Sequence, residues 1–233
     1  MNPDNLRVLI VDDEKSIRRF LKTTLVSNGF TISEASNGKE AQEVFLSFHP
    51  DVIVLDLGLP DMDGVEVTRL IRKKTQTPII ILSVREQESD KISALDAGAD
   101  DYLTKPFSAG ELMARLRAVL RRLARTENDP VFKSGELLVD LSKRLIKVRD
   151  NDVHLSPTEY DVLKVLVMNA GKVLTHTQLL DQVWGKTPED FQGVNHLLRV
   201  TISNLRSKIE PNPTNPSYIL TEPGVGYRLK YDS

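Results

Sequence analysis

The sequence predicts an α/β chain of two domains: a doubly wound, five-stranded parallel sheet comes first, and a smaller domain of strands and helices follows. The length of 233 residues exceeds what one ordinary domain of roughly 100 to 200 residues needs. Residues 6–123 alternate short β-branched runs with longer amphipathic stretches, which is typical of β-α units. After residue 130 the pattern changes to short strands, then capped helices, then a hairpin.

Five strands are expected in the first domain because three of the runs are almost continuously apolar, as strands covered on both faces are. They are residues 7–11, 30–35, 51–56, 78–83 and 101–105. Helical spacing occurs between them, at residues 15–27, 38–48, 65–73, 91–97 and 109–123. Asn37 stands three residues before Glu40, and Ser108 stands three before Glu111, which predicts two capped helix starts.

The second domain is expected at residues 131–233, after a first domain at 1–123 and a polar linker at 124–130. Strands are predicted at residues 136–140, 144–149 and 153–155, with a turn at 150–152. Two capping boxes, Ser156 with Glu159 and Thr175 with Gln178, begin two helices, and a third helix is predicted at 194–209. The segments 218–221 and 227–231 read as a terminal hairpin.

Composition excludes several classes of protein. Hydrophobic residues make up 40% and charged residues 27%, which is near the globular average. The net charge is -2 overall, so any nucleic-acid site must be local. The absence of cysteine excludes disulfides, thiol catalysis and cysteine-bound metals. No apolar run approaches the roughly 18 residues of a membrane span, so a cytoplasmic protein without membrane contact is expected.

Charged side chains follow three strands of the predicted sheet. Asp12 and Asp13 follow the first strand, Asp56 ends the third, and Lys105 ends the fifth. Because the carboxyl ends of parallel strands meet at one edge of a sheet, these groups are expected to converge. Three neighbouring carboxylates repel one another unless a cation joins them, and carboxylate oxygens suit Mg²⁺. The sequence therefore predicts a magnesium site at this edge.

Such a site favours phosphoryl transfer to Asp56. A cation beside Asp56 would shield its charge from an incoming phosphoryl group, and Lys105 would bind a developing oxygen, giving an aspartyl phosphate. Ser83, at the end of the fourth strand, would reorient toward the new phosphate, and Tyr102 would follow it inward. Taken singly, each residue is more often a helix cap, surface or core residue. Their joint placement favours the site.

Residues 6–123 resemble the receiver domain of two-component response regulators. The resemblance rests on Ser83 and on residues 11–14, 55–64, 97–102 and 104–107. It implies that Asp56 is the phosphoacceptor and that Asp13, Asp56, the Gly58 carbonyl and, mainly through water, Asp12 serve Mg²⁺. It also implies that Lys105 contacts the phosphoryl group, that Ser83 and Tyr102 form a switch pair, and that the Lys105-Pro106 bond is cis.

Such a domain takes its phosphoryl group from a sensor histidine kinase. It catalyses only its own phosphorylation and dephosphorylation, so the chain is not expected to be an enzyme with an external substrate.

The predicted helix at 194–209 has one apolar and one polar face. Residues 191–209 carry Arg199, Arg206 and Lys208 and no acidic residue. Such a helix fits a DNA major groove, although an exposed amphipathic helix of ordinary function often looks similar.

Residues 131–231 resemble the winged helix-turn-helix output domain of the OmpR/PhoB subfamily. Residues 155–163, 173–175, 183–185, 194–209 and 224–229 carry this resemblance. It implies that the helix at 194–209 reads promoter DNA, and the expected contacts are Arg199, Ser203, Asn204, Arg206, Thr221 and Arg228. Pro223 stands where some members have a minor-groove arginine, which weakens the case for readout by the wing. Residues 185–193 would form a loop that meets RNA polymerase in several relatives.

The subfamily also implies a homodimer after phosphorylation. Charges on the last two helices and the fifth strand of the receiver would pair across a two-fold axis. The expected interface residues are Lys91, Asp96, Asp100, Asp101, Glu111, Arg115 and Arg122. As pairs within one monomer, the same charges would stabilise it by only about 0 to 1 kcal/mol each.

Residues 57–61, 83–86, 88–91 and 94–101 resemble a narrower branch that regulates potassium-uptake genes with its own sensor kinase. Two alternatives differ in kind. One is a Mg²⁺-dependent phosphatase that uses Asp56, and the other is a constitutive DNA-binding protein whose receiver is only structural.

Overall fold

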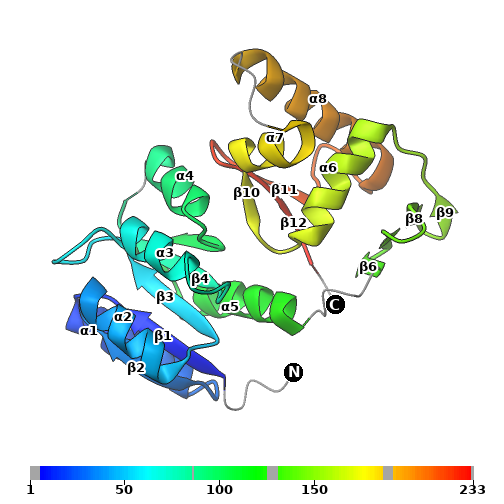
Figure 1. Cartoon of the computed structure of the whole chain (residues 1–233). Coiled ribbons are helices and arrows are strands. Elements are labelled where there is room, and N and C mark those ends of the chain that lie inside the picture. Colours follow the sequence, from blue (N-terminus) through cyan, green and yellow to red (C-terminus); the bar gives the residue numbers. More distant parts are fainter. Residues whose placement is uncertain (1–5, 86, 125–130, 186–190, 232–233) are drawn as a thin grey trace. The chain divides into compact units, whose positions relative to one another are not determined.

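The first compact unit is an open parallel sheet. The computed structural model describes residues 6–85, 87–124, 131–185 and 191–231, and the chain divides into two compact units at residue 124 (Figure 1). The strands of the first unit are β1 (Arg7–Val11), β2 (Thr31–Ala35), β3 (Val52–Asp56), β4 (Ile79–Ser83) and β5 (Asp101–Thr104). They run in the order β2-β1-β3-β4-β5, and every neighbouring pair is parallel. The predicted five-stranded parallel sheet is confirmed.

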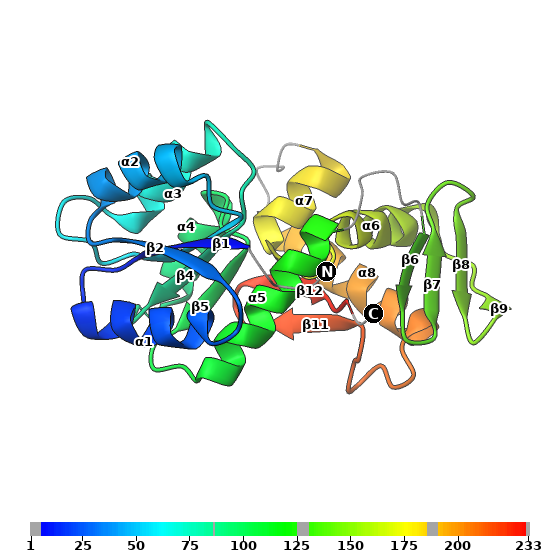
Figure 2. The same cartoon turned by 90° about the horizontal axis from the view of Figure 1, so that it is seen from below.

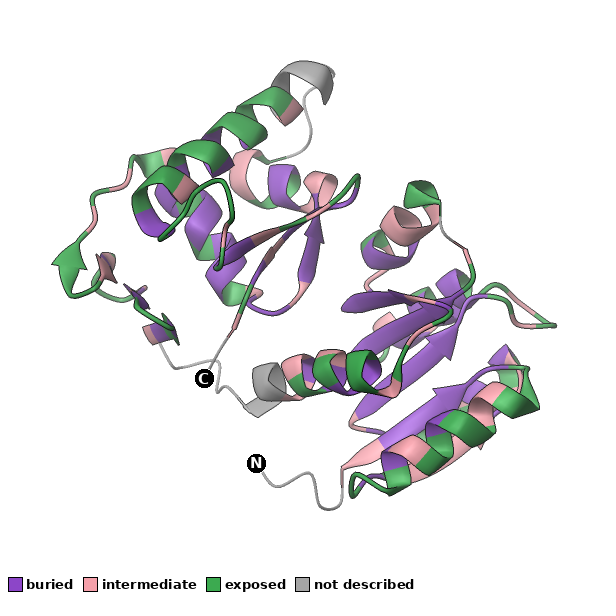
Figure 3. Cartoon of the chain, turned by 180° about the vertical axis from the view of Figure 1, so that it is seen from behind, coloured by how far each residue is buried: buried purple, intermediate pink, exposed green. Residues whose placement is uncertain are grey.

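Helices cover both faces of this sheet. They are α1 (Lys15–Val26), α2 (Gly38–Phe48), α3 (Gly64–Arg72), α4 (Glu88–Asp96) and α5 (Ala109–Ala124). Side chains of α1 and α5 share one core cluster, whereas α2, α3 and α4 lie on the other face (Figure 2). The central strands are buried throughout, while the helices alternate buried and exposed residues (Figure 3). Burial on both faces explains why the sequences of these central strands are continuously apolar.

Side-chain caps begin several of these helices. Asn37 Oδ1 accepts from Glu40 N at 2.9 Å, and Ser108 Oγ accepts from Glu111 N at 3.1 Å, as the sequence predicted. The start of α4 was predicted three residues too late, at residue 91 instead of Glu88. Its first turn is polar and its N-cap, Gln87, makes no side-chain cap bond, so neither apolar spacing nor a capping residue marks it.

The described part of the second unit contains two antiparallel sheets and three helices. One sheet has the order β6-β7-β8-β9, from β6 (Val131–Ser134), β7 (Leu137–Asp140), β8 (Leu145–Val148) and β9 (Asn151–Asp152). The helices α6 (Pro157–Met168), α7 (His176–Trp184) and α8 (Phe191–Ile209) share a core to which Leu163, Leu180 and Leu198 contribute. The other sheet has the order β10-β12-β11, from β10 (Val173–Thr175), β11 (Ile219–Glu222) and β12 (Gly226–Leu229).

The predicted terminal hairpin is the pair β11 and β12, which we call the wing. Strand β12 also pairs with β10, and Gly226 is required there because a Cβ atom would collide with the carbonyl oxygen of Leu174. Both predicted capping boxes are present, at Ser156 and at Thr175. Among the described residues, none of the helices combines the length and apolarity that a membrane crossing requires.

Four details of the second unit were wrong or missing in the prediction. Arg149 and Asp150 both have positive φ angles, of 51° and 63°, so the turn lies there and not at 150–152. Such a pair fits a two-residue hairpin turn, and it makes residues 151–152 the strand in place of 153–155. The short strands β6 and β10 were not predicted, and α8 begins at Phe191 instead of residue 194. The predicted linker, beyond Ala124, lies outside the described residues.

Glu159 provides a stability test for the second unit. Burial acts to raise the pKa of Glu159, but hydrogen bonds from Lys208 Nζ and Ser156 N outweigh it and lower the pKa. We expect Glu159→Gln to lower the free energy of unfolding by about 1 kcal/mol at pH 7. A carboxyl group whose pKa is lowered by folding stabilises the folded state fully above its ordinary pKa, and this stabilisation is lost as the pH falls. The difference in unfolding free energy between wild type and variant should therefore shrink below about pH 4.5.

Thermal unfolding of both proteins at pH 7 and pH 4 measures this difference. A deficit that is the same at both pH values would contradict the ionic origin of the effect.

Candidate functional site

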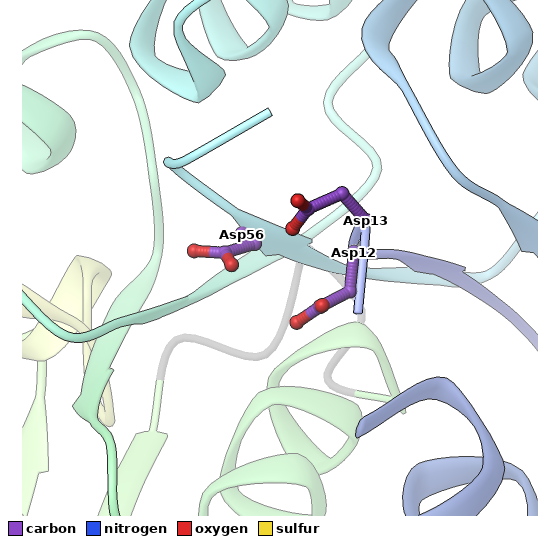
Figure 4. Close-up of side chains that lie close together, drawn as sticks. All are labelled: Asp12, Asp13 and Asp56. Carbon is purple, nitrogen blue, oxygen red and sulfur yellow. The ribbon is translucent and has the colours of Figure 1, made fainter. Parts of the chain in front are cut away.

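Three carboxylates meet at the carboxyl ends of two neighbouring strands. Asp12 and Asp13 follow β1, and Asp56 is the last residue of β3. One ligand oxygen from each lies within 4.8 Å of the others, and Figure 4 shows the three side chains gathered at this edge of the sheet. Asp12 and Asp56 are buried, with 1% and 7% of their surface exposed, whereas Asp13 is exposed. Gly64 lets α3 begin directly against the end of β3, because a Cβ there would collide with the Asp56 carbonyl.

Lys105 joins two of the three carboxylates. Its Nζ donates to Asp12 Oδ2 at 2.8 Å and to Asp56 Oδ2 at 2.7 Å. Lys105 follows β5, its backbone N donates to the Ser83 carbonyl at 2.8 Å, and its bond to Pro106 is cis. The structure therefore brings together the four groups that the sequence placed at the ends of three separate strands.

The charges of this cluster favour a divalent cation, because Lys105 balances only part of them. Burial raises the pKa of Asp12, and the hydrogen bond and charge of Lys105 offset that rise only in part. Burial acts to lower the pKa of Lys105, but its hydrogen bonds to Asp12 and Asp56 and their charges raise the pKa overall. With Asp12, Asp13 and Asp56 ionised and Lys105 protonated, the cluster carries a formal charge of -2. Closely spaced carboxylate oxygens with this net charge fit Mg²⁺.

Gly58 lies beside the Asp56 carboxylate. Its backbone N donates to Asp56 Oδ1 at 3.3 Å, so the loop after β3 wraps around that side chain. Gly58 also forms a β-bridge with Asp63, and a Cβ at Gly58 would meet nothing within 4 Å. The space beside the Gly58 Cα is thus open.

Ser83 and Tyr102 are connected through the loop after β4. Ser83 Oγ accepts from Arg85 N at 3.1 Å, and the Tyr102 hydroxyl donates to the Arg85 carbonyl at 2.6 Å. Both side chains are buried, and burial raises the pKa of Tyr102, although its hydrogen bond with Ser83 acts in the opposite direction. Arg85 was not singled out in the sequence. Its guanidinium pairs with Asp63 at 2.8 Å, so it links the loops after β3 and β4.

The charged surface of α4, β5 and α5 is partly occupied by bonds within the domain. Asp100 is buried and accepts from Arg72 Nη2 at 2.6 Å and from Ile79 N at 2.9 Å. Asp101 is also buried and accepts from Arg115 Nη1 at 2.8 Å. Two of the predicted interface carboxylates thus have partners inside the domain.

The remaining predicted interface residues are more accessible. Asp96 and Glu111 are exposed, Lys91 is half-buried with its ammonium 5.8 Å from the Tyr102 ring centre, and Arg115 is half-buried. The side chain of Arg122 lies outside the described residues.

The predicted DNA contacts fall into two groups. Arg199, Ser203 and Asn204 are exposed on α8, and Thr221 is exposed on β11. Arg206 is instead turned toward the wing, where its Nη2 donates to the Ile219 carbonyl at 2.6 Å and to Thr221 Oγ1 at 2.8 Å.

Arg228 is bound in a similar way. It pairs with Glu222 at 2.9 Å and also donates to the Gly171 carbonyl at 3.3 Å. Arg206 and Arg228 therefore hold the wing, while residues 186–190 of the predicted polymerase loop lie outside the described residues.

Both halves of the chain match known families. Residues 8–117 match the family described as "Response regulator receiver domain", and residues 150–229 match "Transcriptional regulatory protein, C terminal". The chain is 50% identical over 223 residues to the KDP operon transcriptional regulatory protein KdpE of Escherichia coli K12, covering 95% of this chain and 98% of that one. It is 43% identical over 225 residues to the transcriptional regulatory protein KdpE of Mycobacterium tuberculosis H37Rv, covering 96% and 98%.

A solved structure gives the same result for the first half. The crystal structure of a two-component response regulator from Clostridium difficile is 34% identical and covers 52% of this chain and 99% of that one, with a TM-score of 0.51.

The raised pKa of Asp12 yields a test of the acidic cluster. Because burial makes ionised Asp12 costly, we expect Asp12→Asn to raise the free energy of unfolding of the metal-free protein by about 1 kcal/mol at pH 7. The same change removes a candidate ligand, so the stabilisation that Mg²⁺ gives the wild type should fall. Thermal unfolding with EDTA and with Mg²⁺ measures both. A variant that is destabilised in EDTA and fully stabilised by Mg²⁺ would contradict both expectations.

Proposed function

We propose a mechanism on the premise that this chain belongs to the response regulators, in which a receiver domain is joined to a C-terminal winged-helix DNA-binding domain. It is a phosphorylation-dependent regulator of transcription and not a classical enzyme, with a histidine kinase and DNA as its partners. The observation that carries the residue-level mechanism is the meeting of Asp12, Asp13, Asp56 and Lys105 at one sheet edge.

Asp56 is the phosphoacceptor in this proposal. One of its carboxylate oxygens attacks the phosphorus of a phosphohistidine, the new O–P bond forms, and the P–N bond to the imidazole breaks. Lys105, already 2.7 Å from Asp56 Oδ2, then binds an oxygen of the transferred group. Asp12, Asp13, Asp56 and the Gly58 carbonyl are the groups that would hold Mg²⁺. When bound, the ion offsets negative charge between the acceptor and the incoming phosphoryl group.

The signal leaves the site through Ser83. To reach a phosphoryl oxygen, Ser83 Oγ gives up its bond from Arg85 N, and the loop after β4 becomes free to move. The Tyr102 hydroxyl, held by the Arg85 carbonyl, follows that loop. Because Tyr102 belongs to β5 and contacts Lys91 of α4, the rearrangement reaches the charged surface described above.

A receiver dimer is the proposed consequence. Asp96, Glu111, Lys91 and Arg115 supply both signs of charge on accessible surface, as a two-fold interface requires. Asp100 and Asp101 would join only after leaving Arg72 and Arg115. The dimer brings two DNA-binding domains, joined through the linker at residues 124–130, onto a pair of half-sites and raises their effective concentration there.

Helix α8 is the proposed reader of promoter DNA. Arg199, Ser203 and Asn204 are accessible for phosphate or base contacts, and Thr221 lies at the wing. Arg206 and Arg228 act first as anchors of the wing, because their guanidinium groups are engaged with Ile219, Thr221, Glu222 and Gly171. The segment at residues 185–193, whose last three residues belong to α8, remains our candidate contact with RNA polymerase.

The regulated genes are proposed to be those of potassium transport. The support is the 50% identity, over 95% of this chain, to a KDP operon regulator. The cognate kinase is accordingly proposed to be of the KdpD kind. This step rests on that similarity.

Labelling with acetyl phosphate tests the receiver chemistry. With Mg²⁺, we expect the intact mass of the wild type to rise by one phosphoryl group, and no rise for Asp56→Asn. Light scattering of the same samples should show a dimer only for the labelled wild type. Rapid turnover of acetyl phosphate without stable label would favour the phosphatase alternative, and neither label nor turnover would favour a constitutive DNA-binding protein.

Two arginine variants test the division of roles in the second domain, in which Arg199 contacts DNA and Arg206 holds the wing. We expect Arg199→Ala to weaken promoter binding, with a salt dependence reduced by about one phosphate contact, and to leave thermal stability unchanged. Arg206→Ala should lower the unfolding temperature, because two acceptors on the wing, the Ile219 carbonyl and the Thr221 hydroxyl, lose their donor. Equal effects of the two variants on stability would contradict this division.

A further inference from the structure

The carboxylate of Asp13 is close to its neighbours without being held by any described side chain. Asp12 is fixed by Lys105 and by Glu14 N, and Asp56 is fixed by Lys105 and Gly58 N. Among the described residues, the Asp13 carboxylate accepts no hydrogen bond, yet it lies within 4.8 Å of the other two. The described side-chain contact with Asp13 is instead made to its backbone carbonyl.

Arg18 holds that backbone. Its Nη1 donates to the Asp12 carbonyl at 2.7 Å and to the Asp13 carbonyl at 2.9 Å. One nitrogen thus bridges the two peptide groups that carry the acidic pair. The Arg18 side chain is only 16% exposed, and its bond to the Asp12 carbonyl is partly buried, whereas its bond to the Asp13 carbonyl is exposed.

The local structure explains why Arg18 reaches this loop. Arg18 lies in the first turn of α1, its backbone N donates to the Glu14 carbonyl at 3.0 Å, and helical side chains lean toward the helix N-terminus. Its Nε is 3.6 Å from Glu34 of β2, which orients the guanidinium. Glu34 also pairs with Lys22, one turn further along α1, at 2.6 Å.

We propose that Arg18 is a positioning residue for the cation site: by bridging the carbonyls of Asp12 and Asp13, it aims the Asp13 carboxylate at the cluster. This inference rests on the proposed function, because it assigns Arg18 a role in the Mg²⁺ site of the receiver. Among the described residues, Arg18 contacts no carboxylate oxygen of the cluster. It donates to carbonyl oxygens and so does not itself occupy a carboxylate oxygen that could bind a cation.

Lys22 provides a matched control. Both Arg18 and Lys22 are cations of α1 that pair with Glu34, but the Lys22 side chain is 55% exposed and, within the described part of the chain, its ammonium pairs with Glu34 alone. A purely structural role of Arg18, as an ion-pair partner of Glu34, would be shared by Lys22. A positioning role would not.

The test is a Mg²⁺ titration of the full chain, in which binding is measured by calorimetry or by the rise in unfolding temperature. We expect Arg18→Ala to raise the Mg²⁺ dissociation constant about tenfold, and Lys22→Ala to change it less than twofold. Arg18→Lys should resemble Arg18→Ala, because a single ammonium does not reproduce the planar guanidinium that bridges both carbonyls while facing Glu34. Labelling with acetyl phosphate should recover in Arg18→Ala at saturating Mg²⁺.

Equal Mg²⁺ affinities of Arg18→Ala and Lys22→Ala would overturn the proposal, whatever the loss of stability. If Arg18→Ala does not fold, Arg18→Lys decides, and wild-type affinity in that variant would overturn the proposal. The titration does not depend on labelling. A wild type that binds Mg²⁺ but is not labelled at Asp56 therefore contradicts the proposed function and still measures the role of Arg18.

Discussion

The ammonium of Lys105 between Asp12 and Asp56 is the interaction on which the receiver depends. It joins residues that are 93 and 49 positions apart in the chain. Only a parallel sheet that delivers the ends of β1, β3 and β5 to one edge brings them together. Burial disfavours the charged form of Asp12, so its carboxylate would destabilise the folded protein further if Lys105 were absent. The same excess of negative charge that costs stability makes this edge of the sheet chemically suited to a divalent cation.

The loop after β4 connects this edge to the rest of the receiver. Arg85 takes part through three groups: its N bonds to Ser83, its carbonyl to Tyr102 and its guanidinium to Asp63. A change at Ser83 therefore changes the partners of a loop that also holds β5 and α3. The output side is built differently, because the exposed face of α8 carries free polar groups while Arg206 and Arg228 stiffen the wing behind it.

Much of this was predictable from sequence for identifiable reasons. The doubly buried strands and the capping residues Asn37, Ser108, Ser156 and Thr175 are local signals, and the structure has them as expected. The short strands β6 and β10 were missed because three or four residues show no clear period.

The partners of Arg18, Arg206 and Asp100 could not be predicted from the sequence either. Each depends on carbonyls or side chains supplied by tertiary packing, and a charged residue on an amphipathic helix looks the same whether it faces water or a buried carbonyl. For Arg206 the consequence is specific: its spacing suggested the exposed face, and the wing makes it an internal anchor.

The most direct measurement of the central claim locates the cation. Crystals grown with Mn²⁺ in place of Mg²⁺ report the ion through its anomalous scattering. The account predicts one strong peak within coordination distance of oxygens from Asp12, Asp13 and Asp56, with Lys105 beside it. A peak elsewhere on the receiver, or none at a concentration that supports phosphorylation, would contradict it.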